Sequence, residues 1–488
     1  MAVLERSRSI WFCTPWERLR YLRRMLSDAR NALLSRTQEL AAQFLSGLDQ
    51  RPVGRPVDFD ELLDRAGGPM PALGEDPLCT IEHMARCFDA VLTASAGPRY
   101  FGFVTGGSVP AALAADWLTS AWDQNGFNFF TSPAAAAAEE IAARWLVELF
   151  GLPRSTSVGF TTGCTMSNFT GLAAARHALL RKAGWDVESQ GLFEAPRLTV
   201  IVSEESHVTI FAALQMLGLG RDRVIRVPTD AQGRMLASEL RARLNGTTAP
   251  AIVCAQAGNV NTGAFDPIAE IAECVREKSG WLHVDGAFGL WAAASPNYRA
   301  LTRGIEYADS IASDCHKWLN VPYDSGVVFV RDSNAHRTAM TLSAAYYGQR
   351  PDAARDNYNW VPEASRRARG FTVYAALRGL GRSGIAEMIE RCCSLARRMA
   401  DRLSPGPGVT ILNETVLNQI LVRFNPGTGD ADSHTAEVVR RVQEDGLCWL
   451  SPTTWHGLTA MRISVSNWST TEADIDASAD AILRCANV

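Results

Sequence analysis

The chain has 488 residues, of which 47% are hydrophobic and 20% are charged, a composition typical of globular proteins and not of disordered ones. This length corresponds to roughly three domains of about 150 residues each. The 48 basic and 52 acidic residues leave a net charge of −4, so charge gives no reason to expect a nucleic-acid partner. No apolar run approaches the ~20 residues of a membrane helix, so we expect no membrane partner.

The eleven cysteines are scattered, with no CxxC pair and one adjacent pair, Cys392 and Cys393. An odd number without a framework predicts free thiols in a reducing compartment. The first twenty residues contain no apolar core of signal-peptide length. We therefore expect a cytoplasmic protein, and we expect no metal site.

Residues 1 to about 100 are expected to be helical and peripheral. Apolar residues recur at helical spacing from Arg18 to Gly47 and stop at a turn-rich stretch over 50–54. Asp58 is a candidate cap for a second helix that ends at the Gly67-Gly68-Pro69 turn.

From about 100 to 335, short β-rich runs alternate with helical runs. A helix is predicted over 134–150, and four more over 167–183, 208–218, 235–244 and 267–278. The strands are predicted over 157–160, 198–202, 224–227, 251–255, 281–284, 310–313 and 326–330. This alternation predicts an α/β fold with a doubly wound, mostly parallel sheet, in which ligands bind beyond the carboxyl ends of the strands.

The remaining chain divides into a loop and a small domain. The polar stretch from Tyr346 to Trp360 has no clear period and is predicted to be a long loop that serves as a lid. From 371 to 488 the pattern predicts helix 385–403, strand 419–424, helix 434–445, strand 461–466 and helix 472–486. We expect a helical N-terminal segment (1–100), a large domain (101–370) and a small α+β domain (371–488).

Three candidate sites each follow a predicted strand. The turn Gly159–Asn168 (GFTTGCTMSN) is rich in Gly, Thr and Ser and leads into a helix, which suits a phosphate; a simple helix cap is the alternative. Asp285 ends the strand WLHVD, where a carboxylate could hold a cationic ring nitrogen or cap a turn.

The third site is Lys317, one of only three lysines in the chain. Lys182 and Lys278 lie near predicted helix C-termini, where a cation is favoured, but Lys317 directly follows a buried strand. We expect burial to lower its pKa, which makes the amine a nucleophile for Schiff-base chemistry.

A phosphate turn, a strand-end aspartate and a lysine 32 residues later together indicate a pyridoxal 5′-phosphate (PLP) enzyme. In these features the sequence resembles the PLP-dependent amino-acid decarboxylases of the glutamate and aromatic L-amino-acid decarboxylase group, which have the aspartate-aminotransferase fold (type I). The resemblance covers about residues 75–485. It rests on the motifs TTGCTMSN, SEESHVT, GNVNTGAFDP, HVDGAFG, SDCHKWLNVPYDSG and MRISVSNWSTTEADID, which occur in the family's order.

The resemblance implies a role for each matching residue. Lys317 would form the Schiff base, Asp285 would hold the pyridine nitrogen, and His207 would stack on the ring and take part in proton transfer. The other implied cofactor contacts, mainly to the phosphate, are Gly163, Cys164, Thr165, Ser167, Asn259, Ala287 and His316.

The same resemblance implies three contacts with the substrate. Arg462 would bind the α-carboxylate, although a surface arginine is the plain alternative in a chain with 45 arginines. Tyr358, on the predicted lid, would return a proton to Cα. Phe103 would line the substrate pocket, in which Gly102 stands where aromatic-acid decarboxylases usually carry tyrosine.

We therefore expect a cytoplasmic, homodimeric, PLP-dependent decarboxylase that converts an L-amino acid to its amine and CO2, with the N-terminal segment at the dimer interface. A carbon–carbon lyase or a decarboxylating aldehyde synthase on the same scaffold is the alternative. The sequence does not identify the amino acid. A PLP-fold regulatory protein would be expected to lose Lys317 or Asp285, and both are present.

Overall fold

The computed structural model describes residues 15–54, 56–341 and 355–487, which form two compact units, one ending at Ala94 and the other beginning at Ser95. The expected domain boundary at 371 falls in the first turn of a helix, and both sheets lie within the second unit. Among the described residues, no helix is both long enough and apolar enough to cross a membrane.

The first unit is helical, as the sequence predicts. The side chain of Asp58 accepts a hydrogen bond from the backbone N–H of Glu61 (2.9 Å), which confirms the predicted helix cap. Arg36 pairs with Glu82 across two helices at 3.1 Å. The elements of this unit are α2 (Pro15–Ser46), α3 (Phe59–Ala66), α4 (Pro77–Phe88) and η2 (Asp89–Val91).

The second unit is built on a seven-stranded sheet in the order β1-β7-β6-β5-β4-β2-β3. Strands β2 to β6 run parallel, while β7 is antiparallel to both of its neighbours. The mostly parallel sheet is therefore confirmed, with strand ends shifted by a residue from those expected. The strands are β1 (Ser157–Thr161), β2 (Thr199–Ser203), β3 (Ile225–Val227), β4 (Ala251–Gln256), β5 (Trp281–Asp285), β6 (Ser310–Asp314) and β7 (Gly326–Val330).

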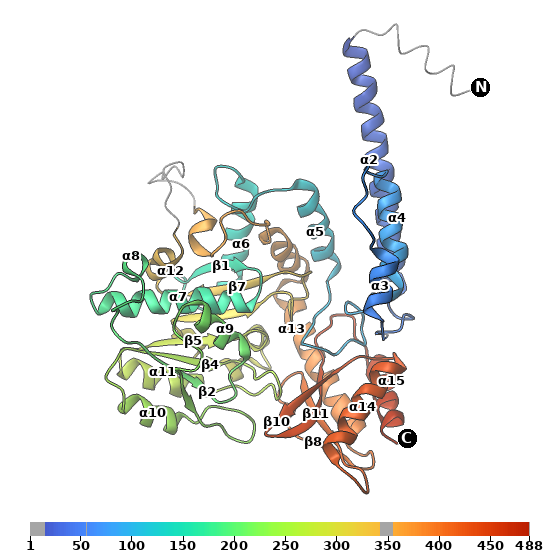
Figure 1. Ribbon diagram of the computed structural model, residues 1–488. Helices are drawn as coiled ribbons and strands as arrows, with labels where there is room; N and C mark the ends of the chain where they lie inside the picture. The colour runs from blue at the N-terminus through green and yellow to red at the C-terminus, as the bar shows by residue number, and fades with distance from the viewer. Residues whose placement is uncertain (1–14, 55, 342–354, 488) are drawn as a thin grey trace, which may run out of the picture. The chain divides into compact units, whose positions relative to one another are not determined.

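Successive side chains of the buried strands enter cores on opposite faces of this sheet. Val200 and Val202 pack in one core with helices α7, α9 and α12, whereas Ile201 between them packs in the other with α6, α10 and α11. Figure 1 shows these two helical layers. The helices of this region are α5 (Pro110–Trp122), α6 (Pro133–Leu149), α7 (Cys164–Lys182), α8 (Val187–Gln190), α9 (Val208–Met216), α10 (Ala237–Asn245), α11 (Ile268–Glu277) and α12 (Ser333–Met340), with 3-10 turns η3 (Gly289–Ala294), η4 (Arg299–Thr302) and η5 (Ile305–Tyr307).

A smaller antiparallel sheet, in the order β10-β11-β9-β8, is packed against α14 and lies in orange-red in Figure 1. This confirms the expected α+β pattern and adds two strands that the sequence did not predict. Its elements are α13 (Gly370–Leu403, with a kink at Gly381), β8 (Val409–Ile411), β9 (Gln419–Phe424), α14 (Ala431–Asp445), β10 (Ser451–Trp455), β11 (Leu458–Ser464) and α15 (Glu472–Ala486).

The predicted long loop is only partly correct. Its first part lies outside the described residues, but Asn357–Trp360 forms a 3-10 turn, η6, in which Asn357, Tyr358 and Asn359 are buried. The side chains of this turn have packing partners that the sequence pattern did not reveal, such as Phe127 against Tyr358.

Candidate functional site

The candidate site lies at one edge of the large sheet, where β1, β5 and β6 end and β7 begins. In the strand register Gly326, the first residue of β7, is opposite both Thr161 and Asp314, the last residues of β1 and β6. The predicted phosphate turn, the strand-end aspartate and the lysine therefore meet at one edge, as expected for the carboxyl ends of parallel strands.

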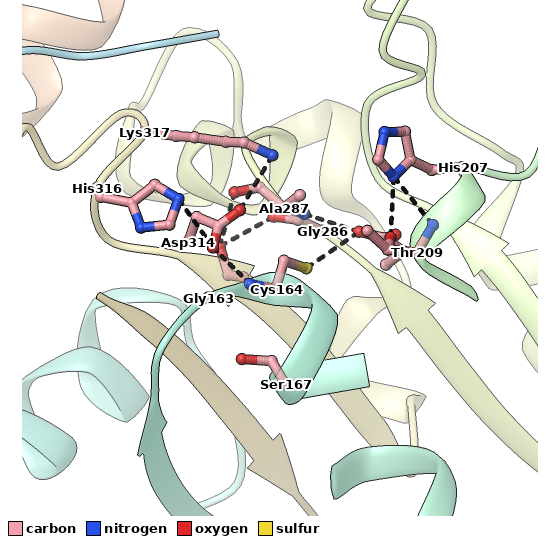
Figure 2. A network of polar contacts seen from close by, with 12 residues as sticks. Gly163, Cys164, Ser167, His207, Thr209, Gly286, Ala287, Asp314, His316 and Lys317 are labelled. Atoms are coloured by element: carbon pink, nitrogen blue, oxygen red, sulfur yellow. Dashed lines mark hydrogen bonds and ion pairs between the residues drawn. The ribbon is translucent and has the colours of Figure 1, made fainter. Parts of the chain in front are cut away.

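The amine of Lys317 pairs with a carboxylate that the sequence reasoning did not single out. Its Nζ lies 3.0 Å from Oδ2 of Asp314 (Figure 2). The other oxygen of Asp314 accepts a hydrogen bond from the backbone N–H of Cys164 (2.6 Å) and lies 3.4 Å from Nε2 of His316. Asp314 thus links the lysine to the first turn of α7. Its position at the end of a buried strand, three residues before the lysine, could have identified it as a site residue from the sequence.

The expectation that the pKa of Lys317 is lowered is wrong for this structure. Burial lowers the pKa of the amine, but the Asp314 carboxylate, with a smaller contribution from Asp285, raises it above its ordinary value. The protonated amine is therefore favoured here, because a carboxylate faces it directly. A Schiff base could form only after the amine loses its proton.

Asp285 is 4% exposed and is held by three donors. Its Oδ1 accepts from the backbone N–H of Ala287 (3.1 Å) and from Sγ of Cys164 (3.4 Å), and its Oδ2 accepts from Nδ2 of Asn168 (3.2 Å). Burial and the neighbouring carboxylates raise the pKa of the Cys164 thiol, so the neutral thiol is the donor. Cys164 therefore bridges the Asp285 and Asp314 ends of the site.

The turn before α7 contacts the adjoining strand backbone to backbone. Gly163 has extended backbone, and a Cβ on it would lie 3.1 Å from Cε1 of His316; a Cβ on Gly326 would lie 2.5 Å from Cα of Gly163. Thr165 lies in the first turn of α7, where N–H groups favour an anion. Ser167 is fully buried and its hydroxyl contacts Thr161 at 2.7 Å, so its role at a phosphate stays a prediction.

The two histidines lie on opposite sides of this turn (Figure 2). Nδ1 of His316 accepts from the backbone N–H of Ser325 (3.1 Å), and Nδ1 of His207 contacts the Thr209 hydroxyl (2.8 Å) and caps α9. Burial lowers the pKa of both imidazoles, which favours the neutral rings. With Nδ1 accepting, each neutral ring carries its proton on Nε2.

Two other predicted cofactor contacts have clear local roles. The Asn259 side-chain oxygen accepts from the backbone N–H of Asn261 (2.8 Å) and of Thr262 (3.2 Å), so it stabilises its own turn. The backbone carbonyl of Ala287 accepts from the N–H of Asp314 (2.9 Å), which joins the ends of β5 and β6. A direct cofactor contact by either residue stays a prediction.

Arg462 is a half-buried cation, and none of the described residues forms a hydrogen bond or an ion pair with its guanidinium. It lies on β11, its Nε is buried without a hydrogen bond, and burial lowers the pKa of its guanidinium. Its charge acts on His207, which places it near the site. A half-buried cation of this kind favours an anionic partner, which the described residues do not supply.

Phe103 lies in a strained segment beside an aromatic cluster. Phe103 and Val104 have φ of 53° and 59°, which is costly for residues other than glycine. Phe103 is 58% exposed and its ring lies 5.6 Å from that of Trp449. A Cβ on Gly102 would lie 2.2 Å from the Trp449 ring, so this tryptophan, which the sequence reasoning missed, fills the space of a side chain at position 102.

Tyr358 is 4% exposed, and its ring is stacked on Phe127 with centroids 4.6 Å apart. Its backbone N–H donates to the carbonyl of Phe127. These contacts place it in a packed turn, and its role as a proton donor stays a prediction.

The groups that meet at this sheet edge fit PLP: an amine for the aldehyde, a buried carboxylate for the ring nitrogen, and a helix N-terminus beside His316 for the phosphate. Within the described residues, no cluster of three or more His, Cys, Asp or Glu side chains could hold a metal ion.

Comparison with known proteins gives a family for residues 69–425, which match the pyridoxal-dependent decarboxylase conserved domain. The chain is 28% identical over 451 residues to an aromatic-L-amino-acid decarboxylase from Bacillus atrophaeus, covering 89% of this chain and 91% of that protein. It is 31% identical over 338 residues to a human acidic amino acid decarboxylase, covering 67% and 64%.

Solved structures share the fold. Oryza sativa TDC with PLP and tryptamine has a TM-score of 0.88 at 23% identity, and covers 94% of this chain and 98% of its own. Mouse CSAD has a TM-score of 0.87 at 24% identity, and covers 94% and 98%. The type I fold is therefore confirmed.

Proposed function

Because the chain belongs to the pyridoxal-dependent decarboxylase family, it is a PLP-dependent carboxy-lyase, and we propose that Lys317, Asp285, His207 and Arg462 carry out its decarboxylation of an L-amino acid. The observation that carries this proposal is the continuous network at the sheet edge. Lys317 contacts Asp314, Asp314 contacts Cys164, and Cys164 contacts Asp285. Lys317, proposed to hold the cofactor aldehyde, and Asp285, proposed to hold its ring nitrogen, are thus connected through direct contacts.

When bound, PLP withdraws the electrons of the bond broken at the substrate's Cα. Lys317 would hold the cofactor through its aldehyde. The Asp285 carboxylate, which accepts three hydrogen bonds and is buried, would stabilise a proton on the ring nitrogen. The first turn of α7 and Nε2–H of His316 would hold the phosphate, and His207 would cover one face of the ring.

Arg462 is proposed to bind the substrate's α-carboxylate. This role is supported by its half-buried guanidinium, which has no anionic partner among the described residues. A bidentate contact from guanidinium to carboxylate would fix the orientation of Cα, and orientation decides which of its bonds is broken.

Tyr358 remains our candidate for returning a proton to Cα, and Phe103 for contact with the substrate side chain. The exposed Phe103 ring beside Trp449 offers an aromatic surface to that side chain. The relatives include both aromatic and acidic amino-acid decarboxylases, so the test must include both classes.

The test is a panel of L-amino acids incubated with the PLP-loaded protein, with mass analysis of all products. We expect one amino acid to yield its amine and CO2 in equal amounts. An aldehyde with ammonia, or a fragment from carbon–carbon cleavage, would instead support the aldehyde synthase or lyase alternative and overturn the proposal.

We also propose that the protein is a cytoplasmic homodimer. Ten described cysteines are free thiols, which is consistent with a reducing compartment. Light scattering of the PLP-loaded protein should give twice the 53.1 kDa of one chain, and a monomer that retains full activity would contradict the dimer.

A further inference from the structure

We propose that Asn168 and His283 are positioning residues, which through one directed chain of hydrogen bonds hold Asp285 as an anion and orient His207. This inference rests on the proposed roles of Asp285 and His207. Neither Asn168 nor His283 has a role in the function argued above, yet both are fully buried beside the site.

Three polar side chains on β5 face the same side of the sheet. Trp281, His283 and Asp285 occupy alternate positions, so all three point towards α7. Gly171 on α7 makes room for the imidazole, because a Cβ there would lie 2.9 Å from Cε1 of His283. The ring is thus held between the helix and the strand, where its nitrogens need partners.

The direction of each hydrogen bond in this series follows from the groups at the two ends of the series. An Asp285 carboxylate only accepts, so the Asn168 amide faces it with Nδ2 (3.2 Å) and turns Oδ1 towards His283. Nε2 of His283, 2.8 Å from that oxygen, must carry the proton. Burial lowers the pKa of His283 to about 4, so the ring is neutral and Nδ1 accepts from Ser310 (2.8 Å).

At the far end the indole of Trp281 donates to Ser310 at 2.8 Å. An indole N–H is only a donor and a carboxylate only an acceptor, so every bond between them is oriented towards Asp285. Ser310 is opposite His283 in the register of β5 and β6.

The second proton of Asn168 Nδ2 reaches the other proposed site residue. It is donated to Oγ1 of Thr209 (3.2 Å), and the Thr209 hydroxyl then donates to Nδ1 of His207 (2.8 Å). One carboxamide with all its donors used therefore sets the position of both Asp285 and the imidazole proposed to cover the cofactor ring. A flip of this amide would present Oδ1 to the Asp285 carboxylate, which is repulsive.

The experiment measures how strongly the apoprotein prefers PLP over its 1-deaza analogue, in which a C–H replaces the ring nitrogen. Binding of each is followed by titration with absorbance or fluorescence. Only PLP gains from a carboxylate held as an anion, so the preference reports on Asp285 alone. We expect His283→Leu to reduce it by about tenfold, since one charge-assisted hydrogen bond is weakened, and His283→Gln to restore most of it, because its amide can still donate to Asn168.

Two further variants keep the result interpretable. His336→Leu is the matched control: His336 is also fully buried and hydrogen-bonded, but to Ser157 and Trp360, and we expect no change in preference. Ser310→Ala is a small change that removes the hydroxyl donor to Nδ1 of His283, so the ring proton is no longer fixed on Nε2. It should reduce the preference for PLP at least threefold, and it provides a test even if His283→Leu does not fold.

The variant Asp285→Asn distinguishes a failure of the proposed role of Asp285 from a failure of the hydrogen-bond chain. If it leaves the preference unchanged, the proposed role of Asp285 fails, and with it this inference. If Asp285→Asn abolishes the preference while His283→Leu and Ser310→Ala both leave it intact, the hydrogen-bond chain is overturned and the proposed function stands.

Discussion

Replacing Arg462 by methionine should have opposite effects on substrate binding and on stability. The guanidinium is half-buried, with Nε fully buried, and has no anionic partner among the described residues, so the resting protein bears part of the cost of desolvating it. Methionine fills similar space without that cost, so we expect an unchanged or higher Tm. Loss of a charge-assisted contact to the substrate carboxylate should cost about 2–4 kcal/mol, or roughly 30- to 700-fold in KM.

The matched control is Arg423→Met on the neighbouring strand β9. Arg423 is paired with Asp432 and with the carbonyl of Thr459, so its loss should lower Tm and leave KM unchanged. Arg462→Lys keeps the charge but not the planar fork, and should give an intermediate KM. The assay combines steady-state kinetics, thermal unfolding and the absorbance of bound PLP. A KM within threefold of wild type, or a Tm loss equal to that of Arg423→Met, would refute the reasoning.

Four further outcomes follow from the site. Lys317→Ala should eliminate the covalent PLP link, and borohydride reduction with peptide mapping should place the pyridoxyl group on Lys317 in the wild type; a label on Lys182 or Lys278 would contradict this. Asp285→Asn should retain PLP and lose most of kcat, measured by CO2 release, whereas a near-normal kcat would exclude the role. Without the phenol as proton donor, reaction with dissolved O2 competes with protonation, so Tyr358→Phe should shift products from amine towards aldehyde, ammonia and hydrogen peroxide; an unchanged amine yield and rate would mean that another group supplies the proton. Burial lowers the pKa of His283 to about 4 from 6.5, so between these pH values only the unfolded chain binds a proton at this residue. The free energy of unfolding should therefore fall by about 3 kcal/mol as the pH drops through this window. Urea unfolding of His283→Gln should not show this loss.

Local sequence pattern was sufficient to predict the strands that carry the site. Buried β-rich runs ending in small or polar residues gave the ends of β1, β5 and β6 within one residue. Two strands of the small sheet escaped prediction for physical reasons. β8 has only three residues, and β10 contains Pro452 and alternates little in polarity.

Some site residues could likewise be predicted from the sequence, and others could not. Lys317 and Asp285 were predictable because each follows a buried strand directly. The contacts of Asn168 and Trp449 were not, because they depend on packing between segments far apart in the chain: Asn168 with His283 across 115 positions, and Trp449 with the Gly102 backbone. The alternate spacing of Trp281, His283 and Asp285 was a signal that strand periodicity could have revealed.

The close approach of Gly326 to Gly163 bears on which form of vitamin B6 the protein can retain. The turn at one end of the proposed cofactor site and the strand that follows the lysine segment are in backbone contact, which leaves no room for them to move closer around a shorter ligand. A vitamer without its phosphate could reach the amine but would make no contact with the first turn of α7, where we propose that the phosphate binds. We therefore expect the protein to retain the phosphorylated aldehyde in preference to pyridoxal.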